Sequence, residues 1–269
     1  PSLVGSEMCI RDSKDVDDWA IQFKRCYETA GITNKDRIQV TPGYGLWTAG
    51  IGFQNGAEKL GAMVIPMGPG NTEKQLQMMM DMESTVLCST SSYALLLAEE
   101  IGKRGIKDKI RLKKGVIGSE RWSQKMRDRI SGELGIELYD IYGLTEIYGP
   151  GIGISCKENC GMHYWDDYIY LEIIDPVTGE NLPDGEIGEI CVKGPILALG
   201  YYNSREKTAE SFLQNPLNHA YDERIYKTGD LGHFAPDGNL MFHGRKDRQV
   251  KHLGHRVELG EIDLAAAKV

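Results

Sequence analysis

Residues 139–146 place an aromatic ring, a glycine, a hydroxyl and a carboxylate in close succession. Tyr142 offers a flat face to a base, Thr145 a hydroxyl to a phosphate oxygen, and Glu146 a hard oxygen ligand to Mg²⁺. We expect Gly143 to turn the backbone sharply after a strand and leave Thr145 and Glu146 beyond its carboxyl end, where open α/β sheets bind ligands. The pattern predicts a nucleotide and metal site, and an ordinary strand-to-loop turn is the competing interpretation.

Three later segments carry further chemistry. Residues 226–231 place Asp230 after a glycine turn, 244–251 carry Arg245 in a charged run, and 252–262 continue that run. A carboxylate such as Asp230 can accept hydrogen bonds from paired hydroxyls, and the Arg245 guanidinium is a rigid cationic fork. The competing interpretations are a turn carboxylate for Asp230, and for Arg245 a solvated ion pair with the acidic residue two positions later.

The segment Cys156, Cys160 and His163 has the spacing Cys-x3-Cys-x2-His. Thiolates and imidazole are zinc ligands, so these residues predict a partial structural zinc site that needs a fourth ligand. Three such residues in a turn also arise by accident. The chain has 6 cysteines scattered over its length, which favours reduced thiols over a disulfide framework.

The composition excludes several classes of partner. The net charge is −8, from 31 Lys and Arg against 39 Asp and Glu, and no sustained basic run could neutralise a nucleic-acid backbone. No run of about 18 uninterrupted apolar residues could span a membrane, and the N-terminus lacks the pattern of a secretory signal. We therefore expect a cytoplasmic protein with neither a nucleic-acid nor a membrane partner.

These side chains must be positioned by the elements that precede them. Apolar residues at steps of three and four predict an amphipathic helix from Lys14 to Ala30. Strand-like and helical runs then alternate, with strands expected at 37–40, 63–66, 85–88, 115–118 and 136–142, and helices at 50–60, 72–82, 92–101 and 121–134. This rhythm predicts an α/β fold with a parallel sheet wrapped by helices, continuing to about residue 150.

Beyond Gly149 the pattern changes to strands and turns, with strands expected at 168–174 and 186–192 and a hairpin at Asp237-Gly238. We infer a β-rich subdomain there. Residues 1–13 have no periodicity that continues into the expected helix after them, and we interpret them as an artefactual leader. The chain stops where a further helix is expected to begin, so we interpret it as a fragment.

Residues 139–146, called the octapeptide below, and the three later segments follow one another in an order that resembles the adenylate-forming superfamily. This superfamily includes acyl-CoA synthetases, peptide-synthetase adenylation domains and luciferases. Residues 14–190 are most similar to phenylacetate-CoA ligases, through words such as Tyr-Gly-Leu-Trp-Thr-Ala-Gly from Tyr44 and Gly-Ala-Glu-Lys-Leu-Gly-Ala from Gly56. Residues 191–263 resemble amino-acid adenylation domains more closely. We interpret the chain as a mosaic with its joint near 183–189.

The resemblance implies a partial AMP-binding large domain at 14–246 and the start of a truncated C-terminal domain at 247–269. It also implies a two-step reaction, in which a carboxylate and MgATP give an acyl-adenylate and pyrophosphate, and a thiol such as coenzyme A then displaces AMP. Thr145 and Glu146 are the implied catalytic groups, with Glu146 on Mg²⁺. The implied nucleotide-binding residues are Gly118, Ser119, Glu120, Asp140, Tyr142, Gly143, Thr145, Asp230 and Arg245.

Within that set, the resemblance implies that Tyr142 stacks on adenine, that Asp230 accepts both ribose hydroxyls and that Arg245 lies near the ribose or a phosphate. Asp247 falls where the superfamily pivots its small C-terminal domain between the two half-reactions, so it is the implied hinge. Lys251, taken as catalytic, stands with Gly254, His255 and Arg256 in the segment that enters the site for thioester formation. An exposed basic hairpin is the competing interpretation of that segment.

The acyl pocket is expected at Tyr44, Gly45, Trp47 and Gly50, a glycine and aromatic loop suited to a flat, apolar aryl acid such as phenylacetate. Core packing is the competing interpretation. Trp47 stands where the family word has phenylalanine, which would change the size of the pocket.

The superfamily's Ser/Thr/Gly-rich phosphate loop is absent, and its adenylation lysine is expected beyond residue 269. Because those groups stabilise the developing phosphate charge, we expect this chain by itself to be inactive. One alternative is an amino-acid or aryl-acid adenylation enzyme that loads a carrier protein. Another is a non-catalytic nucleotide-binding module. A homodimer is among the expected assemblies.

Overall fold

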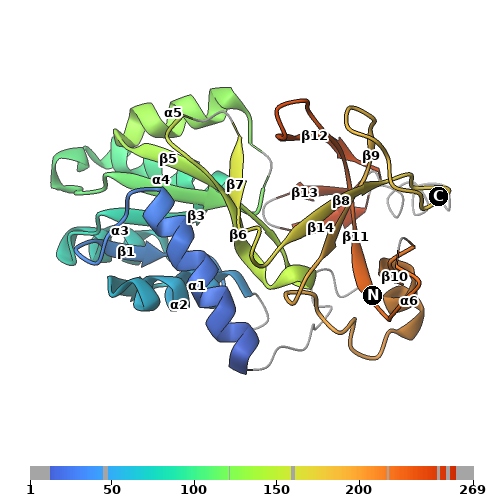
Figure 1. Cartoon of the computed structure of the whole chain (residues 1–269). Coiled ribbons are helices and arrows are strands. Elements are labelled where there is room, and N and C mark those ends of the chain that lie inside the picture. Colours follow the sequence, from blue (N-terminus) through green and yellow to red (C-terminus); the bar gives the residue numbers. More distant parts are fainter. Residues whose placement is uncertain are drawn as a thin grey trace, which may run out of the picture. The chain divides into compact units, whose positions relative to one another are not determined.

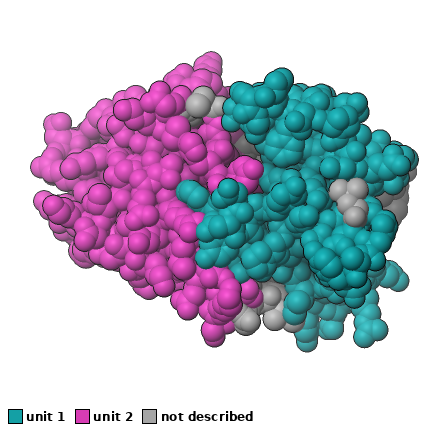
Figure 2. Space-filling model, viewed as in Figure 1, with its two compact units in different colours: residues 1–11, 146–148, 165–269 teal, residues 12–145, 149–164 magenta. Residues whose placement is uncertain are grey.

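The computed structural model describes residues 13–44, 48–120, 122–158, 161–216 and 218–246, together with the backbone of 249–252 and 255–258. The described residues divide into two units, coloured separately in Figure 2. The α/β unit contains residues 13–145 and 149–164, and the β-rich unit contains residues 146–148 and those from 165 onward. Each unit is described by itself.

The α/β unit is built on a sheet of 7 strands in the order β2-β1-β3-β4-β5-β6-β7 (Figure 1). The first five strands in this order are parallel to their neighbours, whereas β6 and β7 are added as antiparallel strands. The strands are β1 (Arg37–Val40), β2 (Met63–Pro66), β3 (Val86–Thr90), β4 (Lys114–Gly118), β5 (Glu137–Leu144), β6 (Gly149–Ser155) and β7 (Met162–Tyr164).

Helices cover both faces of this sheet, because successive residues of each buried strand point to opposite sides. Leu87 of β3 lies in one core cluster with residues of α3, α4 and α5, whereas Cys88 lies 3.5 Å from the Tyr27 hydroxyl of α1 on the other face. The helices are α1 (Ser13–Thr29), α2 (Thr48–Leu60), α3 (Thr72–Asp81), α4 (Ser91–Arg104) and α5 (Gln124–Leu134), with a short 3-10 helix η1 (Lys107–Lys109). The expected α/β fold is confirmed.

Helices α1 and α2 pack tightly because α2 presents glycine to the aromatic face of α1. A Cβ atom on Gly52 would lie 2.3 Å from the ring of Trp19 and 2.5 Å from that of Phe23. The Trp19 indole also donates a hydrogen bond of 2.7 Å to the carbonyl of Pro150 at the start of β6. The amphipathic helix expected from Lys14 therefore anchors the strand that follows the octapeptide.

The β-rich unit is an antiparallel sheet in the order β10-β11-β9-β8, with β12 paired to β11. Its elements are β8 (Tyr170–Ile174), β9 (Gly188–Lys193), α6 (Arg205–Ser211), β10 (Phe212–Gln214), β11 (Arg224–Phe234) and β12 (Leu240–Arg245), and the 3-10 helix η2 (Thr145–Ile147) reaches it from the α/β unit. A separate pair follows, β13 (Gln249–His252) and β14 (His255–Glu258). The hairpin expected at Asp237-Gly238 joins β11 to β12, with Gly238 at a φ of 81°.

Two expected boundaries differ from the observed ones. The helix expected from Arg121 begins at Gln124, because the Ser123 side chain caps its first turn by accepting a 3.2 Å hydrogen bond from the amide of Met126. The change to β structure after Gly149 is present, but β6 and β7 belong to the first sheet, and the units divide at Trp165. None of the described helices is both long and apolar enough to cross a membrane.

Candidate functional site

The octapeptide does not turn where we expected. Strand β5 continues through Gly143 to Leu144, and Gly143 is paired with Pro150 of β6. A Cβ atom on Gly143 would lie 1.9 Å from the carbonyl oxygen of Gly149, so glycine is needed for the close approach of two strands and not for a turn. The expected sharp turn at Gly143 is therefore wrong, because the return of β6 prolongs the ladder.

Thr145 and Glu146 lie beyond the carboxyl end of β5, in η2. Glu146 is only 4% exposed, and its Oε1 accepts a hydrogen bond of 3.0 Å from the Tyr201 hydroxyl. Its carbonyl oxygen accepts the amide of Ala198 at 2.9 Å. Tyr148 follows at a φ of 77°, a strained conformation for a bulky residue. The turn therefore contains a strained backbone at Tyr148, and the hydrogen bond from Tyr201 orients the Glu146 carboxylate.

Tyr201 was not among the site residues that the sequence predicted. Burial, and then the negative charge of Glu146, hold the pKa of Tyr201 well above its ordinary value, so its hydroxyl stays protonated and donates. The sequence feature that could have pointed to Tyr201 is the motif Gly200-Tyr201-Tyr202, in the part of the chain that resembles adenylation domains.

The expected adenine-side loop lies at the end of β4, where Gly118 pairs with Ile141 of β5. Ser119 has a φ of 68°, in the left-handed region. The Glu120 carboxylate accepts hydrogen bonds from the Ser91 hydroxyl at 3.0 Å, and from the amide and hydroxyl of Ser92 at 2.8 and 2.9 Å. Glu120 therefore caps the first turn of α4, which gives it a structural role beside the loop.

Asp140 and Tyr142 stand on neighbouring parts of β5, next to that loop. Burial raises the pKa of the Asp140 carboxyl to about 6, against the opposing effects of a hydrogen bond from Trp122 and the charge of Arg127. The Tyr142 side chain is 36% exposed at the end of the strand. The carboxyl ends of β4 and β5 thus bring Gly118, Asp140 and Tyr142 to one edge of the sheet.

Asp230 and Arg245, far apart in the sequence, are paired across β11 and β12. Their side chains form an ion pair, with 3.0 Å between Nη1 and Oδ1, and the same nitrogen donates to the carbonyl of Thr228 at 3.2 Å. Asp230 is 5% exposed. The ion pair considered as a competing interpretation, between Arg245 and Asp247, lies outside the described residues. The observed ion pair joins Arg245 to Asp230 and holds that carboxylate in one orientation.

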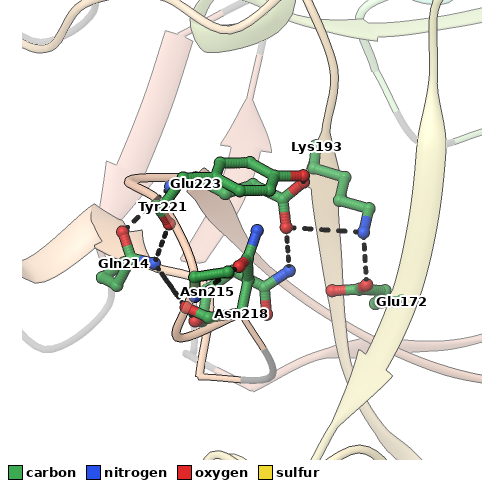
Figure 3. A network of polar contacts seen from close by, with 8 residues as sticks. Glu172, Lys193, Gln214, Asn215, Asn218, Tyr221 and Glu223 are labelled. Atoms are coloured by element: carbon green, nitrogen blue, oxygen red, sulfur yellow. Dashed lines mark hydrogen bonds and ion pairs between the residues drawn. The ribbon is translucent and has the colours of Figure 1, made fainter.

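Two charge clusters on one face of the β-rich sheet were not expected from the sequence. In the first, the Glu189 carboxylate forms ion pairs with Lys227 and Lys246. In the second, shown in Figure 3, the Lys193 ammonium lies 2.9 Å from Glu172 and 3.6 Å from Glu223. Such pairs join strands that are distant in sequence, so spacing along the chain cannot find them.

Two of the four expected pocket residues are described. Burial raises the pKa of Tyr44 to about 12, and its hydroxyl has no hydrogen-bond partner within the described part of the chain. The amide of Gly50 donates to the carbonyl of Gly43 at 3.0 Å, which ties the start of α2 to the segment after β1. Gly45 and Trp47 lie outside the described residues.

Other predicted residues also lie outside them. Asp247, Gly254 and Cys160 are not described, and Lys251, His255 and Arg256 are described by backbone alone, with Lys251 paired to Arg256 between β13 and β14. His163 stands on β7 opposite Ile154, and Cys156 directly follows β6. Among the described residues, no group of three or more His, Cys, Asp or Glu could hold a metal ion, so the zinc site stays a prediction.

Comparisons with known proteins agree on one family. A family model described as AMP-binding enzyme matches residues 20–202. Phenylacetate-coenzyme A ligase from Pseudomonas putida is 46% identical over 213 residues, which cover 77% of this chain and 47% of that protein. Nonribosomal peptide synthetase 7 from Aspergillus fumigatus is 50% identical over 91 residues, covering 34% of this chain and 4% of the synthetase.

The solved structure of 2-hydroxyisobutyryl-CoA ligase, in complex with 2-HIB-AMP and CoA in the thioesterification state, shares the fold. Its TM-score is 0.73 at 22% identity, and the match covers 99% of this chain and 56% of that one. The chain also spans about half the length of the curated phenylacetate-coenzyme A ligase that it matches.

Proposed function

The chain belongs to the AMP-binding enzyme family, and from that premise we propose that it forms part of an AMP-forming acid–thiol ligase. Such an enzyme joins a carboxylate to ATP, releases pyrophosphate, and passes the acyl group from AMP to a thiol. The residues of this chain would supply the adenosine side of the site.

The observation that carries this proposal is the Asp230 carboxylate. It stands beside a glycine with a φ of 74°, is held by Arg245 at 3.0 Å, and is almost fully buried. A carboxylate fixed in this way is suited to accept hydrogen bonds from the two hydroxyls of a ribose, because its orientation is set before the ligand arrives. Arg245 then acts on the ribose through Asp230.

The α/β unit carries groups of its own that suit a nucleotide, at and just beyond the end of β5. The exposed Tyr142 ring suits stacking on adenine, and the hydroxyl of Thr145, an exposed residue, suits a phosphate oxygen. The buried Glu146 carboxylate, oriented by Tyr201, fits the oxygen ligands that Mg²⁺ prefers. The ion, when bound, would neutralise negative charge on the phosphates.

We further propose phenylacetate as the acid and coenzyme A as the thiol, supported by the similarity to the ligase from Pseudomonas putida. Tyr44 and Gly50, with Gly45 and Trp47, would enclose the aryl ring. The segment of Lys251, with Asp247 as hinge, would serve the thioester step.

An amino-acid adenylation enzyme is the second candidate, favoured by the 50% identity to nonribosomal peptide synthetase 7 over 91 residues. Its acceptor would be a carrier-protein thiol. Two ligands separate the candidates sharply. Phenylacetyl and phenylalanyl sulfamoyl-adenosine are stable analogues of the two adenylates. The phenylalanyl group has one additional carbon, which carries an α-ammonium group.

Isothermal titration of both analogues into the chain tests the proposal. We expect the phenylacetyl analogue to bind more tightly, because an ammonium group in an apolar pocket without a partner is costly to desolvate. Tighter binding of the phenylalanyl analogue would favour the carrier-loading enzyme. Failure of the chain to bind AMP or either analogue would contradict the adenylate-forming function itself.

A further inference from the structure

The Asp230 carboxylate is carried on an irregularity of the β-rich sheet. The register between β11 and β9 runs from Lys227 opposite Cys191 to Leu231 opposite Glu189, so three residues of β11 face one residue of β9. The bulge consists of Thr228, Gly229 and Asp230. Bulges of this kind redirect a side chain, but they interrupt the ladder and leave backbone groups to be satisfied in other ways.

The bulge is held by bonds to its own side chains and to β9. The Thr228 hydroxyl donates to the carbonyl of Ile190 at 2.8 Å and accepts the amide of Asp230 at 3.0 Å. The amide of Gly229 donates to Oε1 of Glu189 at 3.1 Å. A side chain of the facing strand thus takes the place of the missing ladder acceptor.

Glu189 is 2% exposed, and a buried carboxylate needs partners that compensate for lost water. Oε1 accepts the hydrogen bond from the amide of Gly229. Oε2 lies 3.0 Å from the ammonium of Lys246 and 3.4 Å from that of Lys227. Lys246 also donates its backbone amide to the carbonyl of Gly229 at 2.8 Å. The carboxylate therefore ties both sides of the bulge, and the residue after Arg245, to β9.

We propose that Glu189 is the positioning residue of the nucleotide site, holding the bulge so that Asp230 meets the ribose. This inference rests on the proposed function for the role of Asp230. In this proposal Glu189 acts on the ribose indirectly, through the amide of Gly229 and the two lysines. Substitution of Glu189 should make the bulge more mobile and reduce the contribution of the ribose hydroxyls to binding.

Two substitutions grade the effect. Glu189→Leu removes the hydrogen bond and both ion pairs of this side chain. Glu189→Gln keeps an acceptor oxygen but turns an amide donor toward two ammonium groups. The matched control is Glu172→Leu, which removes a carboxylate of similar burial on the same sheet, 2.9 Å from Lys193, without touching the bulge (Figure 3).

Binding of AMP and of 2′,3′-dideoxy-AMP to the 269-residue chain measures ribose recognition separately from stability. We expect the wild-type chain to prefer AMP by about tenfold or more, because hydrogen bonds to a charged acceptor are strong. The preference should fall to roughly threefold in Glu189→Gln and nearly vanish in Glu189→Leu, while Glu172→Leu keeps it. Full preference in Glu189→Gln would overturn the proposal, and this variant decides the matter if Glu189→Leu does not fold.

Amide hydrogen exchange of residues 226–232 needs no ligand and gives an independent answer. The amide of Gly229 should exchange about tenfold faster or more in the Glu189 variants than in the wild-type chain and in Glu172→Leu. Unchanged exchange would show that Glu189 does not hold the bulge. A wild-type chain without preference for AMP would instead contradict the proposed role of Asp230, leaving the exchange result to decide the role of Glu189.

Discussion

Substitution of Gly143 by alanine should be among the most damaging single-methyl changes in the α/β unit. The added Cβ would lie 1.9 Å from the carbonyl oxygen of Gly149 and 2.5 Å from Cα of Pro150. The first distance is about 1.5 Å short of ordinary contact, and both atoms belong to the backbone, so no rotamer change can relieve the clash. Strands β5 and β6 must separate.

Overpacking of this kind typically costs about 1–3 kcal/mol, and loss of ladder hydrogen bonds adds to it, so we expect Gly143→Ala to lose about 3 kcal/mol. The control is Gly132→Ala in α5, where an added Cβ meets no atom within 4 Å. Alanine at that helical position should stabilise the chain by about 0.5–1 kcal/mol.

Urea unfolding followed by circular dichroism measures both variants. With a slope of about 3 kcal/mol per molar urea, the midpoint should fall by about 1 M in Gly143→Ala and rise by roughly 0.3 M in Gly132→Ala. A Gly143→Ala chain with the wild-type midpoint, beside a control that behaves as expected, would refute the close approach of the two strands.

Burial raises the pKa of Asp140 from 3.8 to about 6. The ionised carboxylate therefore lowers the stability of the folded chain by its full amount above about pH 6, and it has little effect below about pH 4. Asp140→Asn should therefore stabilise the chain by on the order of 1–3 kcal/mol at pH 8 but not at pH 4, and equal thermal shifts at both pH values would contradict this. Tyr201→Phe removes a hydrogen-bond donor from buried Glu146 and should lower the free energy of unfolding by about 1–3 kcal/mol, measured by thermal unfolding. Tyr202 is 60% exposed, so Tyr202→Phe should change this free energy by less than about 0.5 kcal/mol. Equal effects of the two substitutions would argue against the hydrogen bond. Asp230→Asn should weaken AMP binding about tenfold or more by calorimetry, and unchanged affinity would count against ribose recognition by this side chain.

Local periodicity predicted the α/β part of the fold well. Strands 37–40 and 63–66 are found at the expected residues, and the amphipathic helix from Lys14 is displaced by a single residue. These elements are specified by apolar spacing and by nearby glycines, which act over a few residues. The location of β6 and β7 in the first sheet depends on pairing across the hairpin, which no local pattern contains.

The sequence supplied candidate site residues but could not supply the bonds between them. Asp230 and Arg245 are separate candidates in the sequence, and only the register of β11 and β12 shows that one orients the other. Glu120 is expected at the nucleotide, whereas the start of α4 engages its carboxylate. Glu189 carries no signal of its own, because a single acidic residue in a strand looks like surface charge until the facing bulge is known.

Within the described residues, the backbone passes between the two units at 145/146, 148/149 and 164/165. Residues 146–148 are therefore grouped with a unit whose other described residues begin at Trp165. The hydroxyl that faces the Glu146 carboxylate, from Tyr201, is encoded more than fifty codons downstream. Any recombination joint between residues 149 and 200 would therefore separate these partners genetically while leaving them in contact in the folded product. Exchange of the β-rich segment among related enzymes should succeed most often when the incoming segment supplies a hydroxyl at position 201.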